Sequence, residues 1–306
     1  MEFKKVLITG SGGMLGNAIA PYFRERCPHV LATDIQIEPD ERGWLTYLDV
    51  RDGEAMRRTF AEFRPDLVLH LAALVDLEFC ELHAAEAENT NRTATGIVAR
   101  RAAEYGATLV YISTGGVFDG VKDGYYTEAD QPNPIMVYGA SKFAGEGEVR
   151  AAGGRHYIVR PGWMVGGGRR NDHKFVYLIL DQLAKGARTL HAVDDKWGTP
   201  TYTHDFAMNL FALLDRGAYG LYHMVCKGMG TRFDVAKEIV AICGREVEVK
   251  PVDSSFFGER FFAPRPRSEM LFNQALENLG INLMRDWRAA LREYLERDYA
   301  HLIQQP

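Results

Sequence analysis

The sequence predicts an α/β fold in which helices cover both faces of a parallel sheet. Short apolar runs of strand length alternate with longer segments of helical periodicity through the first half of the chain, as in consecutive βαβ units. A glycine-rich stretch, VLITGSGGMLGNAIA, also separates the first apolar run from the first helical segment, which is typical of a doubly wound sheet. The alternation then stops, and we expect a smaller C-terminal region.

The elements expected in the first half follow from this alternation. The apolar runs predict buried strands at residues 5–10, 30–34, 45–50, 66–73, 108–114 and 156–162. Between them, apolar residues spaced three and four apart predict helices at residues 16–27, 53–63, 93–106 and 141–153.

The pattern changes after Trp163. Residues 166–173 form a charged, glycine-rich break, and residues 193–205 have loop-like composition. Beyond them we expect a helix at 205–217, a strand at 220–225 and a final amphipathic helix at 286–299. The layout therefore predicts one nucleotide-binding domain and a smaller C-terminal region.

Composition and charge narrow the class of protein. The chain has 306 residues, 46% hydrophobic and 25% charged, which suits a globular protein with a large core or two domains. The net charge of -5 comes without a long basic run, so we expect no nucleic-acid partner. The longest apolar stretch, near DLVLHLAALV, is too short to cross a bilayer, and the N-terminus lacks the apolar core of a signal peptide.

The four cysteines show no paired spacing, which favours a reduced, cytoplasmic compartment. Cys80 and His83 lie three residues apart, but no second ligand pair follows. We therefore interpret them as helix residues and expect no metal site.

The glycine stretch has the composition of a phosphate-binding loop. Glycines allow a tight turn and close approach of a pyrophosphate, and the following helix offers free N–H groups at its positive end. A purely structural turn is the alternative. The predicted cofactor-binding residues of this loop are Gly10, Ser11, Gly12, Gly13, Met14, Leu15 and Gly16.

An acid ends each of the next two strands. Asp34, followed by Ile35, can accept hydrogen bonds from both hydroxyls of an adenosine ribose and would repel a 2′-phosphate. Because no Arg or Lys follows at once, we favour NAD(H) over NADP(H). Asp49 and Val50 end the third strand, where adenine would lie. A simple cap of the next helix is an equally good interpretation of Asp49.

Several motifs, taken in order, carry a family resemblance. TGSGGMLG, HLAALVD, ISTGGVFDG and VYGASK resemble the extended short-chain dehydrogenase/reductase family. TEADQPNPIMVYGASKFAGE, RPGWMVGG, VDDKWGTPTYTHD and PRPRSEML resemble its dTDP-4-dehydrorhamnose reductase branch, and together the motifs span essentially the whole chain.

The resemblance implies two domains and an activity. An NAD(P)-binding Rossmann domain would comprise 1–162 with 203–228, and a substrate-binding domain 163–202 with 229–306. The implied activity is NAD(P)H-dependent reduction of a nucleotide-activated 4-keto-6-deoxy sugar, as in the biosynthesis of nucleotide sugars and surface polysaccharides. Its partner is then a small nucleotide sugar. The motif HLAALVD would place Leu71, Ala72 and Ala73 beside the cofactor.

The resemblance also implies a catalytic set: Thr114, Tyr138 and Lys142. Reduction of a ketone needs a proton on oxygen, and a tyrosine with a pKa near ~10 needs help to exchange one at neutral pH. Lys142 stands four residues after Tyr138, on the same helical face, where its charge can lower that pKa. It would also bind the nicotinamide ribose, and Tyr138 would contact the cofactor as well. The alternative to a catalytic role is that Tyr138 and Lys142 are solvated residues on a surface helix.

The predicted substrate residues are Thr114, Gly115, Tyr138, Trp163 and Arg265. The branch usually has Asp-Tyr where this chain has Gly115-Gly116, a loss that we expect to widen the site. The related dehydratases have an Asp-Glu pair there, so this chain lacks their acid–base pair.

Two of these residues have competing interpretations. Trp163 would pack on a sugar face or belong to the core. Arg265, with Arg267, would bind a diphosphate or lie in a solvated loop. Lys196 stands where the branch often has glutamine.

Two other functions stay open at this point. The regulatory subunit of methionine adenosyltransferase resembles the same branch, so the chain could be a non-catalytic binding subunit. Another epimerase or reductase of nucleotide sugars in the same family is the second alternative. We also keep a homodimer open.

Overall fold

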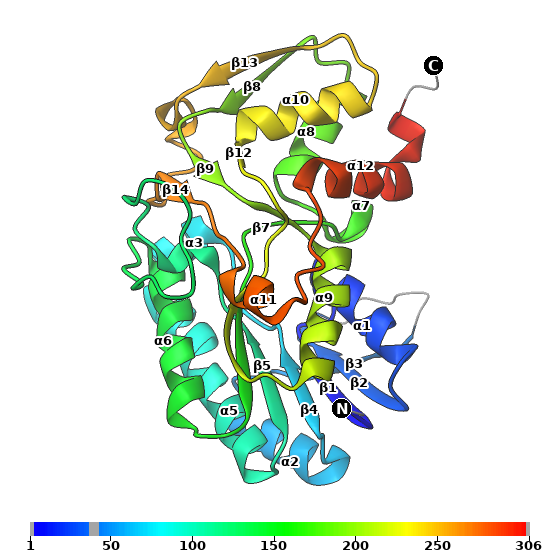
Figure 1. Ribbon diagram of the computed structural model, residues 1–306, viewed down its shortest axis with the longest axis vertical. Helices are drawn as coiled ribbons and strands as arrows, with labels where there is room; N and C mark the ends of the chain where they lie inside the picture. The colour runs from blue at the N-terminus through cyan, green and yellow to red at the C-terminus, as the bar shows by residue number, and fades with distance from the viewer. Residues whose placement is uncertain (1–2, 37–42, 304–306) are drawn as a thin grey trace.

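The computed structural model describes residues 3–36 and 43–303. Its centre is a seven-stranded parallel sheet in the order β11-β6-β5-β4-β1-β2-β3 (Figure 1). The strands are β1 Lys5–Thr9, β2 His29–Asp34, β3 Leu45–Tyr47, β4 Leu67–His70, β5 Thr108–Ile112, β6 His156–Arg160 and β11 Gly220–His223. The predicted α/β fold class, a doubly wound Rossmann sheet, is confirmed.

Helices pack on both faces of this sheet. Alternate strand residues serve opposite faces: Val6 and Ile8 of β1 belong to one core cluster, and Leu7 belongs to the other. All three are fully buried, as expected for a parallel sheet with two covered faces. One face is covered by α1 Gly16–Arg24 and α9 Thr203–Arg216, and the other by α2 Gly53–Phe63, α5 Ala94–Glu104 and α6 Val137–Ala151.

The strand order reverses beside β1. The chain runs outward through β2 and β3 and then returns through α2 to β4, on the other side of β1. Ligands of such sheets bind at the carboxyl ends of the strands at this switch point. Here the loop after β1 meets the loop after β4, because a Cβ built on Gly10 would lie 2.5 Å from the Ala72 backbone nitrogen.

Several predicted boundaries are wrong. The strand predicted at 45–50 ends at Tyr47, and the one predicted at 66–73 covers only Leu67–His70, because the chain leaves the sheet at these carboxyl ends. The helix predicted at 93–106 extends a helical stretch that begins earlier. That stretch comprises α3 Leu77–Leu82, α4 Ala84–Glu88, a π-helical turn at Asn89–Thr93 and then α5.

The chain leaves the sheet after β6 and rejoins it at β11. As predicted, a helix and a strand follow residue 203: α9 packs against α1, and β11 pairs with β6 at the sheet edge. The division into two domains at the stated boundaries remains a prediction.

Most of the remaining elements lie beyond the carboxyl ends of the sheet strands, whereas α11 Gln274–Leu279 packs against β11 at the sheet edge (Figure 1). Residues 166–173 and 193–205, predicted as loops, contain the helix α7 Gly168–Asn171 and the strands β9 Trp197–Gly198 and β10 Pro200–Tyr202. Both strands pair with segments that are distant in sequence. The strands are β7 Trp163–Val165, β8 Thr189–Val193, β9 Trp197–Gly198, β10 Pro200–Tyr202, β12 Gly230–Thr231, β13 Glu248–Val252 and β14 Ser268–Glu269. The helices are α7 Gly168–Asn171, α8 Phe175–Ala184, α10 Arg232–Ile242, α11 Gln274–Leu279 and α12 Trp287–Asp298.

Candidate active site

Thr114 and Tyr138 meet at the carboxyl edge of the sheet. Thr114 follows β5, and its Oγ1 accepts a hydrogen bond of 3.1 Å from the Gly116 backbone N–H. Tyr138 lies in the first turn of α6, which the Glu81 carboxylate caps by accepting the Val137 N–H at 2.8 Å. The Tyr138 hydroxyl lies near enough to Thr114 for the Thr114 side chain to lower its pKa. The structure therefore brings together two of the three predicted catalytic groups.

The Tyr138 phenol holds its proton strongly. Burial raises its pKa to about 12, although the Thr114 side chain acts to lower it, and the nearby charge of Glu269 also raises it. We expected Lys142 to lower this pKa, but in the structure Lys142 is not among the groups that shift it.

Lys142 lies one turn further along α6 and is buried. Burial lowers its pKa to about 7, and the Glu146 carboxylate one turn later acts in the opposite direction. Its Nζ lies 4.4 Å from the centre of the Tyr111 ring, while the Tyr111 hydroxyl donates a 3.0 Å hydrogen bond to the Lys142 carbonyl. The lysine is therefore held in place by its own neighbours on β5 and α6.

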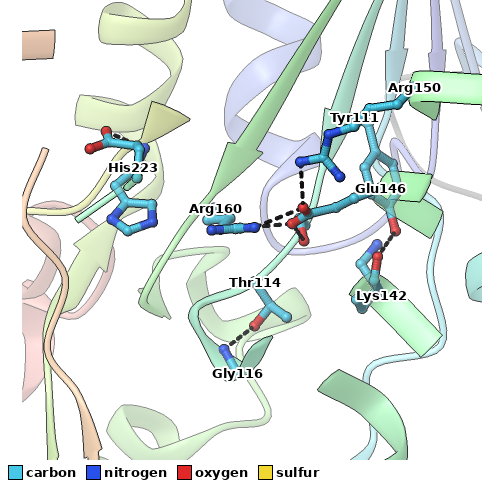
Figure 2. A network of polar contacts seen from close by, with 10 residues as sticks. Tyr111, Thr114, Gly116, Lys142, Glu146, Arg150, Arg160 and His223 are labelled. Carbon is cyan, nitrogen blue, oxygen red and sulfur yellow. Dashed lines mark hydrogen bonds and ion pairs between the residues drawn. The ribbon is translucent and has the colours of Figure 1, made fainter. Parts of the chain in front are cut away.

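A buried ion pair fixes this part of α6 to the sheet. The Glu146 side chain is fully buried and accepts hydrogen bonds from Arg160 Nε at 2.7 Å and Arg160 Nη2 at 2.8 Å. Ser113 on the strand side and Arg150 on the helix complete the set, at 2.7 and 3.0 Å (Figure 2). Sequence reasoning missed this network, although KFAGE places Glu146 one turn after Lys142.

Asn91 is a second residue that sequence reasoning missed. It lies in the π-helical turn, and its side chain accepts from the Leu74 N–H and donates to the Leu74 carbonyl, at 2.8 and 2.9 Å. It also donates to Ser141 Oγ at 3.0 Å. Asn91 thus connects the loop after β4, where Leu71, Ala72 and Ala73 were predicted to bind cofactor, to the helix that carries Lys142. No local signal in NTNR reveals this.

The glycine loop is built for close backbone approach. Gly10 has a φ of 72°, and a Cβ on Gly16 would lie 2.5 Å from the Ser11 Cα. Gly13 differs, because it is exposed and a Cβ there would meet only the Gly10 carbonyl, at 3.5 Å. Its φ lies outside the left-handed region, so Gly13 does not need glycine geometry. The N-cap of α1, Leu15, provides no side-chain cap, so this loop fits a phosphate group.

Gly13→Val is expected to abolish cofactor binding while the protein stays folded, because the branched side chain projects into the open space before α1. Gly16→Val is the matched control, and it should destabilise the fold through contact with Ser11. Thermal unfolding and isothermal titration with NADH and NADPH measure both effects. Parent-like cofactor affinity in a folded Gly13→Val protein would leave the loop with a structural role only.

The two predicted acids, Asp34 and Asp49, have different hydrogen-bond partners. Asp34 faces the glycine loop, with Oδ2 accepting the Gly12 N–H at 2.9 Å and Oδ1 accepting the Gln36 N–H at 3.0 Å. Asp49 forms a bidentate pair with Arg51, and these hydrogen bonds lower its pKa. The alternative of Asp49 as a helix cap is wrong, because Asp52 caps α2.

Trp163 and Arg265 both have protein partners. The Trp163 indole N–H donates to Glu269 Oε2 at 2.8 Å, and the Arg232 guanidinium lies 3.9 Å from the indole ring centre. Arg265 Nη2 donates to Glu78 Oε1 at 2.7 Å, which opposes its interpretation as a solvated loop residue. Their predicted contacts with substrate stay predictions.

Gly115 and Gly116 do not open the site as expected. Both are buried, and a Cβ on Gly115 would lie 3.1 Å from Leu271 Cδ1. A Cβ on Gly116 would lie 3.1 Å from Met136 Cε and 3.5 Å from Glu269 Oε1. The expectation of a widened site is therefore wrong at these positions, because side chains from β14 and its neighbours fill the space.

The described residues show neither a metal site nor an activated thiol near Thr114 and Tyr138. Within the described ranges, no group of three or more His, Cys, Asp or Glu side chains is placed to hold a metal ion. Burial raises the pKa of the Cys80 thiol to about 11, so it stays protonated. In residues 3–36 and 43–303, no helix is both long and apolar enough to cross a membrane.

Comparisons with known proteins agree with one another. The family described as "RmlD substrate binding domain" matches residues 4–300. The dTDP-4-dehydrorhamnose reductase of Mycobacterium tuberculosis is 34% identical over 94% of this chain and 91% of its own. A solved dTDP-4-dehydrorhamnose reductase from Clostridium acetobutylicum has a TM-score of 0.87 and 34% identity, covering 95% of this chain and 98% of its own. Another, from Bacillus anthracis in complex with NADP, has a TM-score of 0.83 and 28% identity, covering 96% and 99%.

Proposed function

The chain belongs to the RmlD substrate binding domain family, and from this membership we propose that it reduces the keto group of a nucleotide-activated 4-keto-6-deoxy sugar, as a dTDP-4-dehydrorhamnose reductase does. The electron donor is a nicotinamide dinucleotide. The observation that carries the proposal is the proximity of Thr114 to Tyr138 at the carboxyl edge of the sheet, with buried Lys142 one turn away on the same helix.

The proposal assigns a role in the reaction to each of these residues. The loop from Gly10 to Gly16 would hold the pyrophosphate of NAD(P)H, and the cofactor, when bound, would supply the hydride that the carbonyl carbon receives. Tyr138, protonated at neutral pH because its pKa is raised to about 12, donates its proton to the carbonyl oxygen as negative charge develops there. Thr114 donates a hydrogen bond to the same oxygen. Lys142, in its cationic form, would bind the nicotinamide ribose and place a positive charge one helical turn from Tyr138.

The test is oxidation of NADH and NADPH in the presence of a panel of nucleoside diphosphate 4-keto sugars. We expect a 4-keto-6-deoxy sugar, including the dTDP-linked one, to be reduced with oxidation of NADH or NADPH. The corresponding alcohol should not react with the reduced cofactor. Failure to turn over any member of the panel would contradict a reductase and favour the non-catalytic binding subunit.

We expect NADH to bind at least as well as NADPH, because the Asp34 carboxylate faces the glycine loop and repels a 2′-phosphate. Asp34→Ala should narrow the difference between the two affinities in isothermal titration. A clear preference of the parent for NADPH would overturn this use of Asp34, and the Bacillus anthracis structure is in complex with NADP.

Two further predictions complete the proposal. Cytoplasmic location follows from the proposed biosynthetic role, and cell fractionation tests it. The homodimer remains a prediction that light scattering of the purified protein would decide.

A further inference from the structure

Glu269 places its carboxylate beside Gly116, which has no side chain. The residue lies at the end of β14, between Trp163 and the buried glycines after β5. Its Oε2 is held by the Trp163 indole N–H at 2.8 Å. Within the part of the chain that the structure describes, the Glu269 carboxylate accepts no other hydrogen bond, and Oε1 is left for another donor.

The free oxygen and the Thr114 hydroxyl both lie close to one point beside Gly116. A Cβ built on Gly116 would lie 3.5 Å from Glu269 Oε1 and 3.4 Å from Thr114 Oγ1. The two oxygens are therefore no farther apart than the sum of these distances. The Glu269 charge also raises the pKa of Tyr138, which agrees with a position beside the same site.

The surroundings hold this carboxylate in one orientation and raise its pKa overall. Burial raises the pKa of Glu269, while the Trp163 hydrogen bond and the charges of Arg232 and Arg265 lower it. Arg232 lies over the Trp163 ring, at 3.9 Å from its centre. The indole therefore has one edge on Glu269 and a cation on its face, so it acts as a support for the carboxylate.

We propose that Glu269 determines substrate specificity by accepting a hydrogen bond from the sugar hydroxyl next to the reacting carbonyl. In a 4-keto-6-deoxy sugar, the carbon on one side of the ketone carries a hydroxyl and the carbon on the other side carries the methyl group. A carbonyl oxygen held by Thr114 and Tyr138 brings that hydroxyl, the 3-hydroxyl, toward Oε1. This inference rests on the proposed function and assigns the role of the missing side chains at Gly115 and Gly116 to a residue of β14.

The physical consequence is discrimination between hydroxylated and deoxy sugars. A hydrogen bond to a charged group is worth about 10- to 100-fold in affinity. A sugar without the 3-hydroxyl leaves the Glu269 carboxylate half-paired in a buried site, and this penalty appears in kcat/KM. Trp163 is a positioning residue for this bond, because it touches only the oxygen that does not face the sugar.

The experiment compares a nucleoside diphosphate 4-keto-6-deoxy sugar with its 3-deoxy analogue. Parent, Glu269→Ala, Glu269→Gln and Trp163→Phe proteins are each assayed for kcat and KM with both sugars, beside thermal unfolding and cofactor titration. We expect the parent to prefer the hydroxylated sugar by about 10- to 100-fold in kcat/KM. Glu269→Ala should reduce this preference to about threefold or less by losing activity on the hydroxylated sugar alone.

The other variants test the details. Glu269→Gln keeps the volume and should retain part of the preference, whereas Trp163→Phe keeps the carboxylate and should weaken the preference mainly through KM. Equal use of the two sugars by the parent would overturn the inference while leaving the reductase intact, and so would an unchanged preference in folded Glu269→Ala. Reduction of neither sugar by the parent would contradict the proposed function itself and, with it, this inference.

Discussion

Replacing Tyr138 with phenylalanine is expected to remove turnover while cofactor and sugar nucleotide still bind. The change deletes one hydroxyl, the proton donor, and keeps the ring that packs beside Thr114. Loss of a general acid typically costs about 10²–10⁴-fold in rate. Steady-state reduction of a 4-keto sugar nucleotide measures the loss, and isothermal titration of both ligands measures what is retained.

Two neighbouring variants provide the comparison for Tyr138→Phe. Thr114→Val should mainly lower turnover, because it removes one hydrogen bond to the reacting oxygen. Lys142→Met should weaken turnover and cofactor binding together, because the lysine is assigned two contacts. A Tyr138→Phe protein as active as the parent would show that these three residues no longer perform the chemistry.

Glu146→Gln is expected to cost about 3–5 kcal/mol of folding free energy, since it leaves a buried arginine without its counter-charge. Arg160 is 1% exposed, so water cannot replace the lost carboxylate. Arg150→Gln is the matched control on the opposite side of Glu146. Its side chain is 44% exposed, and its loss should cost about 0–1 kcal/mol. Urea unfolding compares the two, and equal losses would contradict the role given to the buried pair.

The same substitution should also change the pH dependence of cofactor binding. Lys142 is cationic below its pKa of about 7, and the Glu146 charge raises that pKa. Removing the charge lowers the pKa, so the pH above which the lysine is neutral moves down. Cofactor affinity measured against pH should therefore weaken at a lower pH in Glu146→Gln than in Arg150→Gln. Identical pH profiles of cofactor affinity in the two variants would show that the Glu146 charge does not affect the pKa of Lys142.

Local signals in the chain were sufficient to predict the fold class, whereas the catalytic residues were implied by the order of several motifs and the family resemblance that they carry. Runs of apolar residues predicted the strands of the sheet, and the spacing of Gly10, Gly13 and Gly16 predicted the turn into α1. Tyr138 and Lys142 share a helical face simply because they are four residues apart. Each of these properties depends on neighbours within one or two turns of the chain, so a sequence reveals them directly.

Contacts between distant segments were decided only by the tertiary structure. The sequence led us to expect an open space at Gly115 and Gly116, but Leu271 and Glu269 come from β14 and its flanks to fill it. The sequence left Arg265 between diphosphate binding and a solvated loop, and the structure pairs it with Glu78. Packing brings such residues together from positions far apart in the chain, and the burial that then sets their charges and pKa values exists only once the whole chain has folded.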